Sequence, residues 1–116
     1  MTPQEQAHFR VLQILGEHPE INQRELAQRL GVSLGKTNYL LNALIEKGWI
    51  KIGNFRRSES KLRKVAYLLT PAGIRHRIRL TGAYLARKEA EYDALKAEID
   101  ALRRQAEASG PEEGVA

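Results

Sequence analysis

The chain has 116 residues, of which 42% are hydrophobic, and its 19 Lys and Arg outnumber its 14 Asp and Glu to give a formal net charge of +5. It contains no cysteine, so disulfide frameworks, thiolate zinc fingers and iron–sulfur sites are excluded. The length suits one domain with a modest core. The N-terminus lacks the pattern of a signal peptide and no stretch approaches the ~20 apolar residues of a membrane span, so we expect a cytoplasmic protein.

The charges are unevenly distributed along the chain. Residues 1–88 hold 16 basic and 6 acidic side chains, a net of +10, whereas residues 89–116 hold 3 basic and 8 acidic ones, a net of −5. A basic body followed by an acidic end favours a polyanionic partner for the body, most often nucleic acid. The alternative is a charged surface that serves solubility alone.

The first predicted element is a helix that starts at residues 2–5 and runs to about Gly16. Its start combines a capping Thr2, a proline in the first turn and Glu5 at the capping-box position. A loop over residues 17–20 follows, and Ile21 is expected to pack inside the next helix. The apolar side of the first helix is formed by His8, Val11, Leu12 and Leu15.

Residues 22–48 predict two helices joined by a tight turn. Asn22 can cap the first helix while Glu25 reaches back to the exposed amide. Gly31 provides the positive φ that the turn needs, Val32 is expected to enter the core, and Ser33 caps the second helix. The inward side chains of the first helix are Leu26, Ala27 and Leu30, and those of the second are Thr37, Leu40, Leu41 and Leu44.

The second of these helices ends at Gly48 and leaves one face free to contact something outside the protein. That outward face carries Leu34, Gly35, Lys36, Asn38, Tyr39 and Asn42. Hydrogen-bonding groups, one charge and one small residue favour a DNA-reading helix-turn-helix. By itself, the stretch is equally compatible with a helical hairpin in any small helical domain.

A β-hairpin is predicted after this pair of helices. The periodicity becomes alternating at residues 49–52, with Trp49 as a large buried anchor and Ile50 and Ile52 on one face. Gly53 and Asn54 begin a connection, residues 55–61 form a polar loop, and a second strand covers about Lys64–Leu69. Five basic residues against one acidic lie between Arg56 and Lys64, so the pattern predicts a wing with a basic tip.

Residues 70–73 repeat the capping pattern and start a long helix that reaches about Ala108, although Gly82 weakens it by about 1 kcal/mol relative to Ala. Apolar residues recur in heptads along it, which predicts pairing with a second copy; folding back onto its own domain is the alternative. One seam position holds Ile78, Leu85, Tyr92, Ile99 and Ala106, and the other holds Ile74, Thr81, Lys88, Leu95 and Leu102.

The expected domains are therefore a DNA-binding domain over residues 1–73, a dimerisation helix over residues 74–108 and a disordered tail over residues 109–116. The residues expected at the dimer seam are Ile78, Leu85, Tyr92, Leu95, Ile99 and Leu102. In a parallel pair Glu91 faces Lys96 of the partner and Glu98 faces Arg103, which weakly favours that orientation over the antiparallel one.

Catalytic and cofactor chemistry finds no support in the sequence. Residues 31–37 resemble a phosphate-binding loop, but only three residues separate the two glycines and a helix precedes them instead of a strand. The histidines, His8, His18 and His76, lie far apart in sequence without further ligands, and no serine has a His and carboxylate nearby. We expect no enzyme activity, no cofactor and no metal.

With helices, turn, wing and final helix in place, the chain resembles winged helix-turn-helix regulators of the MarR family. The segments that carry the resemblance are residues 23–27, 30–33, 44–50 and 67–73. More specific are the segments 33–39, 53–55 and 87–92, which together resemble a small MarR-like group associated with exopolysaccharide biosynthesis gene clusters. The chain departs from the wider family in having one C-terminal helix where a pair is usual.

The resemblance implies a mainly α fold with a small β-hairpin and a homodimer that binds a pseudo-palindromic site in double-stranded DNA. In this hypothesis Asn38 and Asn42 contact adenine, and Lys36 contacts guanine or phosphate. The expected DNA-binding residues are Ser33, Leu34, Gly35, Lys36, Asn38, Tyr39, Asn42, Arg56, Arg57, Lys61 and Arg63. The sequence indicates no particular effector, and a protein-interaction module or an RNA-binding protein are the competing classes.

Overall fold

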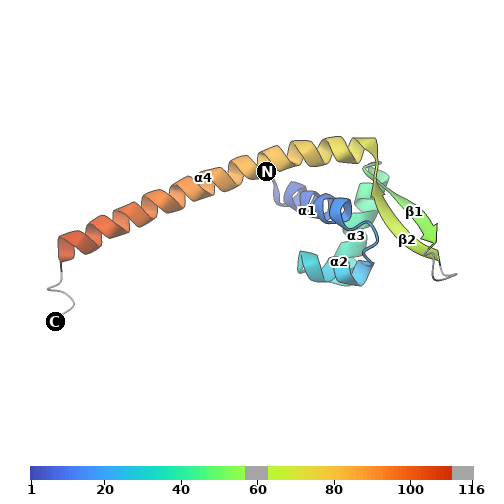
Figure 1. Cartoon of the computed structure of the whole chain (residues 1–116), viewed down its shortest axis with the longest axis horizontal. Coiled ribbons are helices and arrows are strands. Elements are labelled where there is room, and N and C mark those ends of the chain that lie inside the picture. The colour runs from blue at the N-terminus through green and yellow to red at the C-terminus, as the bar shows by residue number, and fades with distance from the viewer. Residues whose placement is uncertain (57–62, 111–116) are drawn as a thin grey trace. The chain divides into compact units, whose positions relative to one another are not determined.

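The structure, a computed structural model, describes residues 1–56 and 63–110, with the side chains of residues 54–56 and 63–64 outside that description. The described elements are α1 (Pro3–Glu17), α2 (Gln23–Leu30), α3 (Leu34–Glu46), β1 (Ile50–Arg56), β2 (Arg63–Leu69) and α4 (Pro71–Ser109) (Figure 1). Helices therefore dominate the described part of the chain, and one antiparallel hairpin lies between α3 and α4 in the sequence. This confirms the predicted winged helix-turn-helix fold with a long final helix.

The chain divides into two compact units, Met1–Ala83 and Tyr84–Ala116. The first unit contains α1, α2, α3, the hairpin and the first turns of α4, where Gly73 and Leu80 are buried. The second unit contains the remainder of α4 up to Ser109. The predicted tail lies largely outside the described residues, so it and the predicted domain ranges stay predictions.

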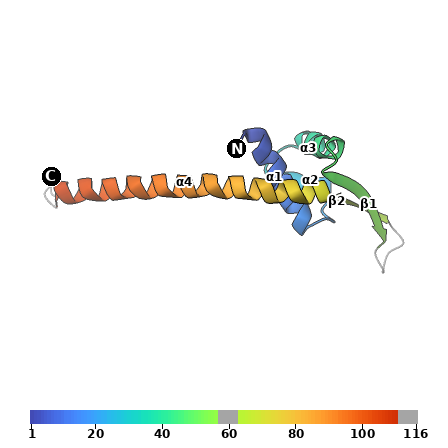
Figure 2. The same cartoon turned by 90° about the horizontal axis from the view of Figure 1, so that it is seen from above.

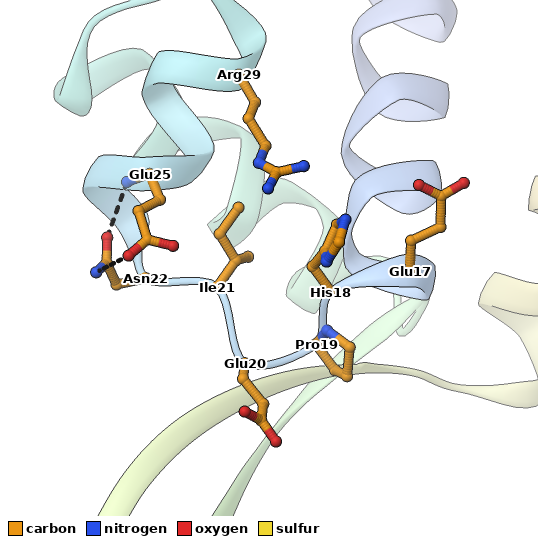
Figure 3. Close-up of a pocket in the computed structure, with 8 residues that line it drawn as sticks. All are labelled: Glu17, His18, Pro19, Glu20, Ile21, Asn22, Glu25 and Arg29. Atoms are coloured by element: carbon orange, nitrogen blue, oxygen red, sulfur yellow. Dashed lines mark hydrogen bonds between the residues drawn. The ribbon is translucent and has the colours of Figure 1, made fainter.

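Side-chain caps fix the starts of α1 and α2. The Glu5 amide donates to Thr2 Oγ1 at 3.1 Å and the Thr2 amide donates to Glu5 Oε1 at 3.2 Å, which completes the capping box. At α2 the Glu25 amide donates to Asn22 Oδ1 at 2.8 Å (Figure 3). The Glu25 carboxylate accepts from the side-chain amide of Asn22 at 2.9 Å, not from its backbone as predicted.

The turn between α2 and α3 depends on Gly31, which has φ +71° and so occupies the left-handed region. Its amide donates to the carbonyl of Ala27, and the next amide, of Val32, donates to the same carbonyl at 3.1 Å. The prediction that Val32 enters the core is wrong, since its side chain is 38% exposed. Val32 closes this turn through its backbone, which leaves its side chain at the rim of the core.

The core of the first unit comes from all three short helices and from the base of the hairpin. The predicted inward faces of α1, α2 and α3 are confirmed, and Ile21 is also buried. A cation completes the packing, because Arg10 of α1 donates to the carbonyls of Leu30 and Arg29 at 3.0 and 2.8 Å. Its guanidinium therefore satisfies carbonyls at the C-terminal end of α2, where a positive charge is favoured.

The hairpin is longer than the sequence indicated. Strand β1 continues through Gly53 and Asn54, predicted to begin a connection, and pairs with β2 from Ile50–Leu69 to Arg56–Arg63. Backbone pairing overrides the turn preference of these two residues. The helices lie on one side of the strands (Figures 1 and 2). In β1 Ile50 is 2% exposed and Ile52 is 56% exposed, whereas Tyr67, the partner of Ile52 in β2, is buried.

The start of α4 approaches the end of α3 at backbone distance. Thr70 donates from Oγ1 to the Gly48 carbonyl at 2.6 Å and from its amide to the Trp49 carbonyl at 3.0 Å. The same hydroxyl accepts from the Gly73 amide at 3.1 Å and so caps α4. A Cβ at Gly73 would overlap the Trp49 carbonyl oxygen, so this contact requires a glycine.

Two histidines that lie far apart in sequence meet at one tryptophan. The His76 ring stacks on Trp49 at 3.9 Å between centroids, and His8 contacts Trp49 edge-on at 6.0 Å. Trp49 is half-buried and not buried as predicted, and Lys47 lies over its ring at 5.3 Å. His8 of α1 and His76 of α4 therefore both contact Trp49, which lies between α3 and β1.

Burial lowers the pKa of both histidines. Lys47 and Lys36 act in the same direction on the pKa of His8, against Glu5, while Arg79, Arg75 and Lys47 lower the pKa of His76. Nδ1 of His76 is buried without a hydrogen-bond partner in the described part of the chain. The fold therefore favours the neutral form of both rings.

We expect the free energy of unfolding to decrease on acidification from about pH 8 to pH 5. The folded pKa values lie below the unfolded value of about 6.5, so this stabilisation is present above that pH and lost as pH falls through the lowered values. Urea unfolding at a series of pH values measures it. The double variant His8→Gln with His76→Gln should flatten the dependence, and a wild-type stability that rises on acidification would show that the rings are charged in the fold.

Candidate nucleic-acid interface

One side of α3 is buried and the other is exposed. The inward Thr37, Leu40, Leu41 and Leu44 are at most 3% exposed. The opposite side carries the predicted contact residues, all exposed, and is called here the recognition face: Leu34, Gly35, Lys36, Asn38, Tyr39 and Asn42. The structure thus brings together all predicted site residues of α3 on one surface.

The N-terminal end of α3 is suited to bind an anion. Ser33 Oγ accepts from the Lys36 amide at 3.0 Å, and the Ser33 carbonyl accepts from the Thr37 amide at 3.0 Å. The amides of Leu34 and Gly35 precede this hydrogen-bond ladder and carry the positive end of the helix dipole. The run 31–37 is a turn and a helix start, in keeping with the rejection of a nucleotide-binding loop.

Lys36 and Tyr39 form a pair within the recognition face. The ammonium of Lys36 lies 5.1 Å from the centre of the Tyr39 ring, one helical turn away. Tyr39 is 62% exposed, so its ring and hydroxyl project from the domain. This pair presents a cation, an aromatic face and a hydroxyl together.

The two asparagines of the recognition face belong to a line of hydrogen bonds that extends into α2 and β2. Nδ2 of Asn42 donates to Oδ1 of Asn38 at 2.8 Å, and Nδ2 of Asn38 donates to Oε1 of Gln23 at 3.4 Å. Nε2 of Gln23 in turn donates to the Tyr67 hydroxyl at 2.9 Å. Sequence reasoning missed Gln23 and Tyr67, because no local pattern joins a residue of α2 to one 44 positions later.

The predicted basic wing is only partly described. Arg56 and Arg63 form the last described pair of the hairpin, and their side chains are outside the description. Arg57 and Lys61 lie outside the described residues. Of the four predicted cations, the register of the hairpin therefore brings together only Arg56 and Arg63. Their contact with DNA stays a prediction.

The predicted seam residues of α4 are exposed in the single chain. The exposed fractions run from 40% for Ile99 to 66% for Ile78. The seam residue Lys88 bonds Glu91 in its own helix at 3.2 Å, and Arg87 bonds the same carboxylate at 3.2 Å. The hydrogen bond with Glu91 raises the pKa of Lys88, and the reciprocal bond lowers the pKa of Glu91.

A hollow of about 430 Å³ lies between the end of α1 and α2 (Figure 3). Its lining includes the carboxylates of Glu17, Glu20 and Glu25 with the guanidinium of Arg29. An excess of carboxylates does not suit a phosphate backbone, so we do not assign this hollow to DNA. Among the described residues, His, Asp and Glu side chains form no group of three that could hold a metal ion.

The sequence of this interface matches a known family. Residues 4–51 match the family model described as winged helix-turn-helix DNA-binding, which covers α1, the two helices of the turn and the start of β1. No curated protein matches the chain. Residues 4–51 are therefore similar to a winged helix-turn-helix DNA-binding domain, in agreement with the fold.

Solved structures of transcriptional regulators share the fold. The PcaV transcriptional regulator from Streptomyces coelicolor is 25% identical over 89% of this chain and 77% of that chain, with a TM-score of 0.58. A MarR/EmrR family regulator from Acinetobacter sp. ADP1 is 22% identical over 84% and 72%, with a TM-score of 0.59. A MarR family regulator from Rhodococcus sp. RHA1 is 20% identical over 85% and 69%, with a TM-score of 0.63.

Two of these three neighbours are described as MarR-family regulators and the third as a transcriptional regulator, and together with the match over residues 4–51 they support a DNA-binding transcriptional regulator. The prediction that the chain is not an enzyme agrees with these neighbours. Within the part of the chain that the structure describes, no helix has the length and apolarity needed to cross a membrane.

Proposed function

We propose that the chain is a sequence-specific regulator of transcription that binds double-stranded DNA as a homodimer. The observation that carries this proposal is the recognition face of α3, whose six residues are all exposed while the opposite side of the helix is buried in the core. A helix presented in this way fits the major groove.

Each part of the recognition face has a role in this proposal. Asn38 and Asn42 contact the N6 and N7 edge of adenine, and Lys36 contacts guanine or a phosphate. The start of α3 at Ser33 binds a phosphate, and Tyr39 contacts the sugar–phosphate backbone. The wing cations Arg56, Arg57, Lys61 and Arg63 contact the backbone or the adjacent minor groove.

Gly35 supports close approach of α3 to the DNA. Glycine costs a helix about 1 kcal/mol relative to Ala. Nothing within the described fold demands it: its φ is not positive, and the nearest atom to an added Cβ is Ser33 Oγ at 4.0 Å. The absence of a side chain leaves room for close approach of a partner outside the domain.

The seam of α4 supports pairing with a second copy. Leucine, isoleucine and tyrosine recur at heptad spacing with at least 40% of their surface exposed, and a second seam covers such a stripe. The Lys88–Glu91 bond satisfies a seam cation within its own helix. Because two-fold pairing duplicates α3, we expect a roughly palindromic DNA site with half-sites about one turn apart.

Exopolysaccharide biosynthesis genes are the first targets to examine, since the segments 33–39, 53–55 and 87–92 resemble regulators associated with such gene clusters. A protein-interaction module is the competing function, and the excess of cations between Arg56 and Lys64 argues against it. The other competing function is RNA binding, which competition between duplex DNA and structured RNA tests.

Selection of bound fragments from random DNA should enrich a palindromic sequence. In a salt titration on that sequence, Lys36→Gln should weaken binding and reduce the slope of log K against log salt by about one, because one phosphate contact is lost. Arg104→Gln removes the same charge from the second unit and should leave the slope unchanged. If no sequence is enriched and Lys36→Gln has no effect, the proposed orientation of α3 is wrong.

Gly35→Ala should have opposite effects on stability and on binding. The added methyl should stabilise α3 by up to about 1 kcal/mol in thermal unfolding and weaken specific DNA binding by about tenfold or more, since it blocks close approach. Gly82→Ala is the matched control, because an added Cβ there also meets nothing within 4 Å. It should stabilise without weakening binding, and equal binding by both variants would contradict the role given to Gly35.

Leu95→Glu combined with Leu102→Glu should convert the dimer to a monomer, because paired carboxylates at a buried seam are strongly disfavoured. Sedimentation or light scattering on the full chain measures the mass. Ala97→Glu, on the side of α4 away from the seam, should remain a dimer. A wild-type monomer, or a dimer that survives both seam substitutions, would exclude the proposed seam.

A further inference from the structure

The hydrogen-bonded line that ends at Tyr67 bears on how the recognition face selects bases. Its four members come from three elements: Asn42 and Asn38 from α3, Gln23 from α2 and Tyr67 from β2. Every amide donates to the next member in the same direction. The line therefore has a polarity, with its donor end at the recognition face and its acceptor end at the strand.

Polarity matters because an asparagine amide has two opposite ends. Bidentate contact with adenine requires the oxygen toward the N6 amino group and the nitrogen toward N7. A flipped amide presents the reverse pattern and no longer matches adenine. If Asn38 flipped, its nitrogen would face the donor of Asn42 and its oxygen would face the acceptor of Gln23. The line thus penalises a flip of Asn38 alone at both of its contacts.

Tyr67 anchors the acceptor end of the line. Its side chain is only 8% exposed, and its amide donates to the Pro19 carbonyl at 3.2 Å, so both the ring and the backbone are held. Gln23 is half-buried and is the first residue of α2, directly after Asn22, which caps that helix. A fixed hydroxyl and a fixed helix start therefore define where the side-chain amide of Gln23 lies. Because a phenol hydroxyl can donate as well as accept, they fix the place of this amide and oppose the flip of any single member of the line.

The line leaves donors and acceptors of Asn38 and Asn42 available to contact a base. Asn42 uses one of its two N–H groups toward Asn38, so its oxygen and its other N–H remain available to a base edge. Asn38 uses one N–H and one lone pair, and retains one of each. Both residues can still make the adenine contact while the line is intact.

We propose that Gln23 and Tyr67 are specificity-determining positioning residues, which hold the amides of Asn38 and Asn42 in the orientation that selects adenine. This inference rests on the proposed function, because it assigns the preference of the same site. Gln23 and Tyr67 themselves contact no base in this proposal. Their effect is therefore on discrimination between sequences and not on affinity for DNA in general.

The test compares affinity for the selected site with affinity for the same duplex carrying a substituted adenine–thymine pair. Gln23→Leu removes both hydrogen bonds and should lower this ratio by about tenfold, while binding to random duplex changes little. Tyr67→Phe removes the anchor alone and should lower the ratio by a smaller factor. Gln28→Leu, the same change at an exposed position of the same helix, should leave the ratio unchanged.

Gln23→Glu provides a rescue. A carboxylate still accepts from Asn38 and can accept from the Tyr67 hydroxyl, so discrimination should be retained even though the added negative charge weakens binding to all DNA. A residue with a merely structural role would not separate discrimination from affinity in this way.

Side-chain amide signals of Asn38 and Asn42 in NMR spectra of the free protein provide a readout without DNA. The chemical shifts of both amides should change in Gln23→Leu and remain unchanged in Gln28→Leu. If the wild type discriminates and Gln23→Leu discriminates equally well with unchanged amide signals, the inference is overturned while the proposed function stands. If the wild type shows no sequence preference, the proposed function itself fails. Should Gln23→Leu unfold, Tyr67→Phe gives the same comparison.

Discussion

The burial of one side of α3 is the constraint on which the candidate interface depends. Thr37, Leu40, Leu41 and Leu44 are sealed against the other helices, and this packing fixes the rotation of α3 about its own axis. Every outward side chain takes its direction from that rotation. A helix of 3.6 residues per turn cannot bury this apolar set and turn Asn38 or Asn42 inward at the same time. Core packing and the chemistry of the outer surface are thus one constraint.

The periodic parts of this arrangement could be predicted from the sequence. The caps at Thr2, Asn22 and Ser33 and the left-handed turn at Gly31 have local signatures, because each involves residues within one helical turn. The inward face of α3 follows from spacing alone. These local signals are strong enough to give the helix boundaries, the fold and most of the recognition face.

What the sequence did not yield depends on contacts between distant residues. The extension of β1 through Gly53 is decided by pairing with Ala66. The Trp49–His76 stack joins residues 27 positions apart in the chain, and the Gln23–Tyr67 bond spans a longer separation. Neither pair has a local pattern, so side-chain chemistry alone could not have linked them.

The total number of basic residues overstates the positive charge that is available to a polyanion, and Arg10 is an example. Its guanidinium lies on the carbonyls of Arg29 and Leu30, where it neutralises a helix end. Arg79 similarly lies 3.7 Å from the carboxylate of Glu5. A positive charge that is paired within the chain in this way contributes less to counterion release when a nucleic acid approaches. For the proposed DNA binding, the salt dependence is consequently that of a sparser positive surface than the total of basic residues indicates.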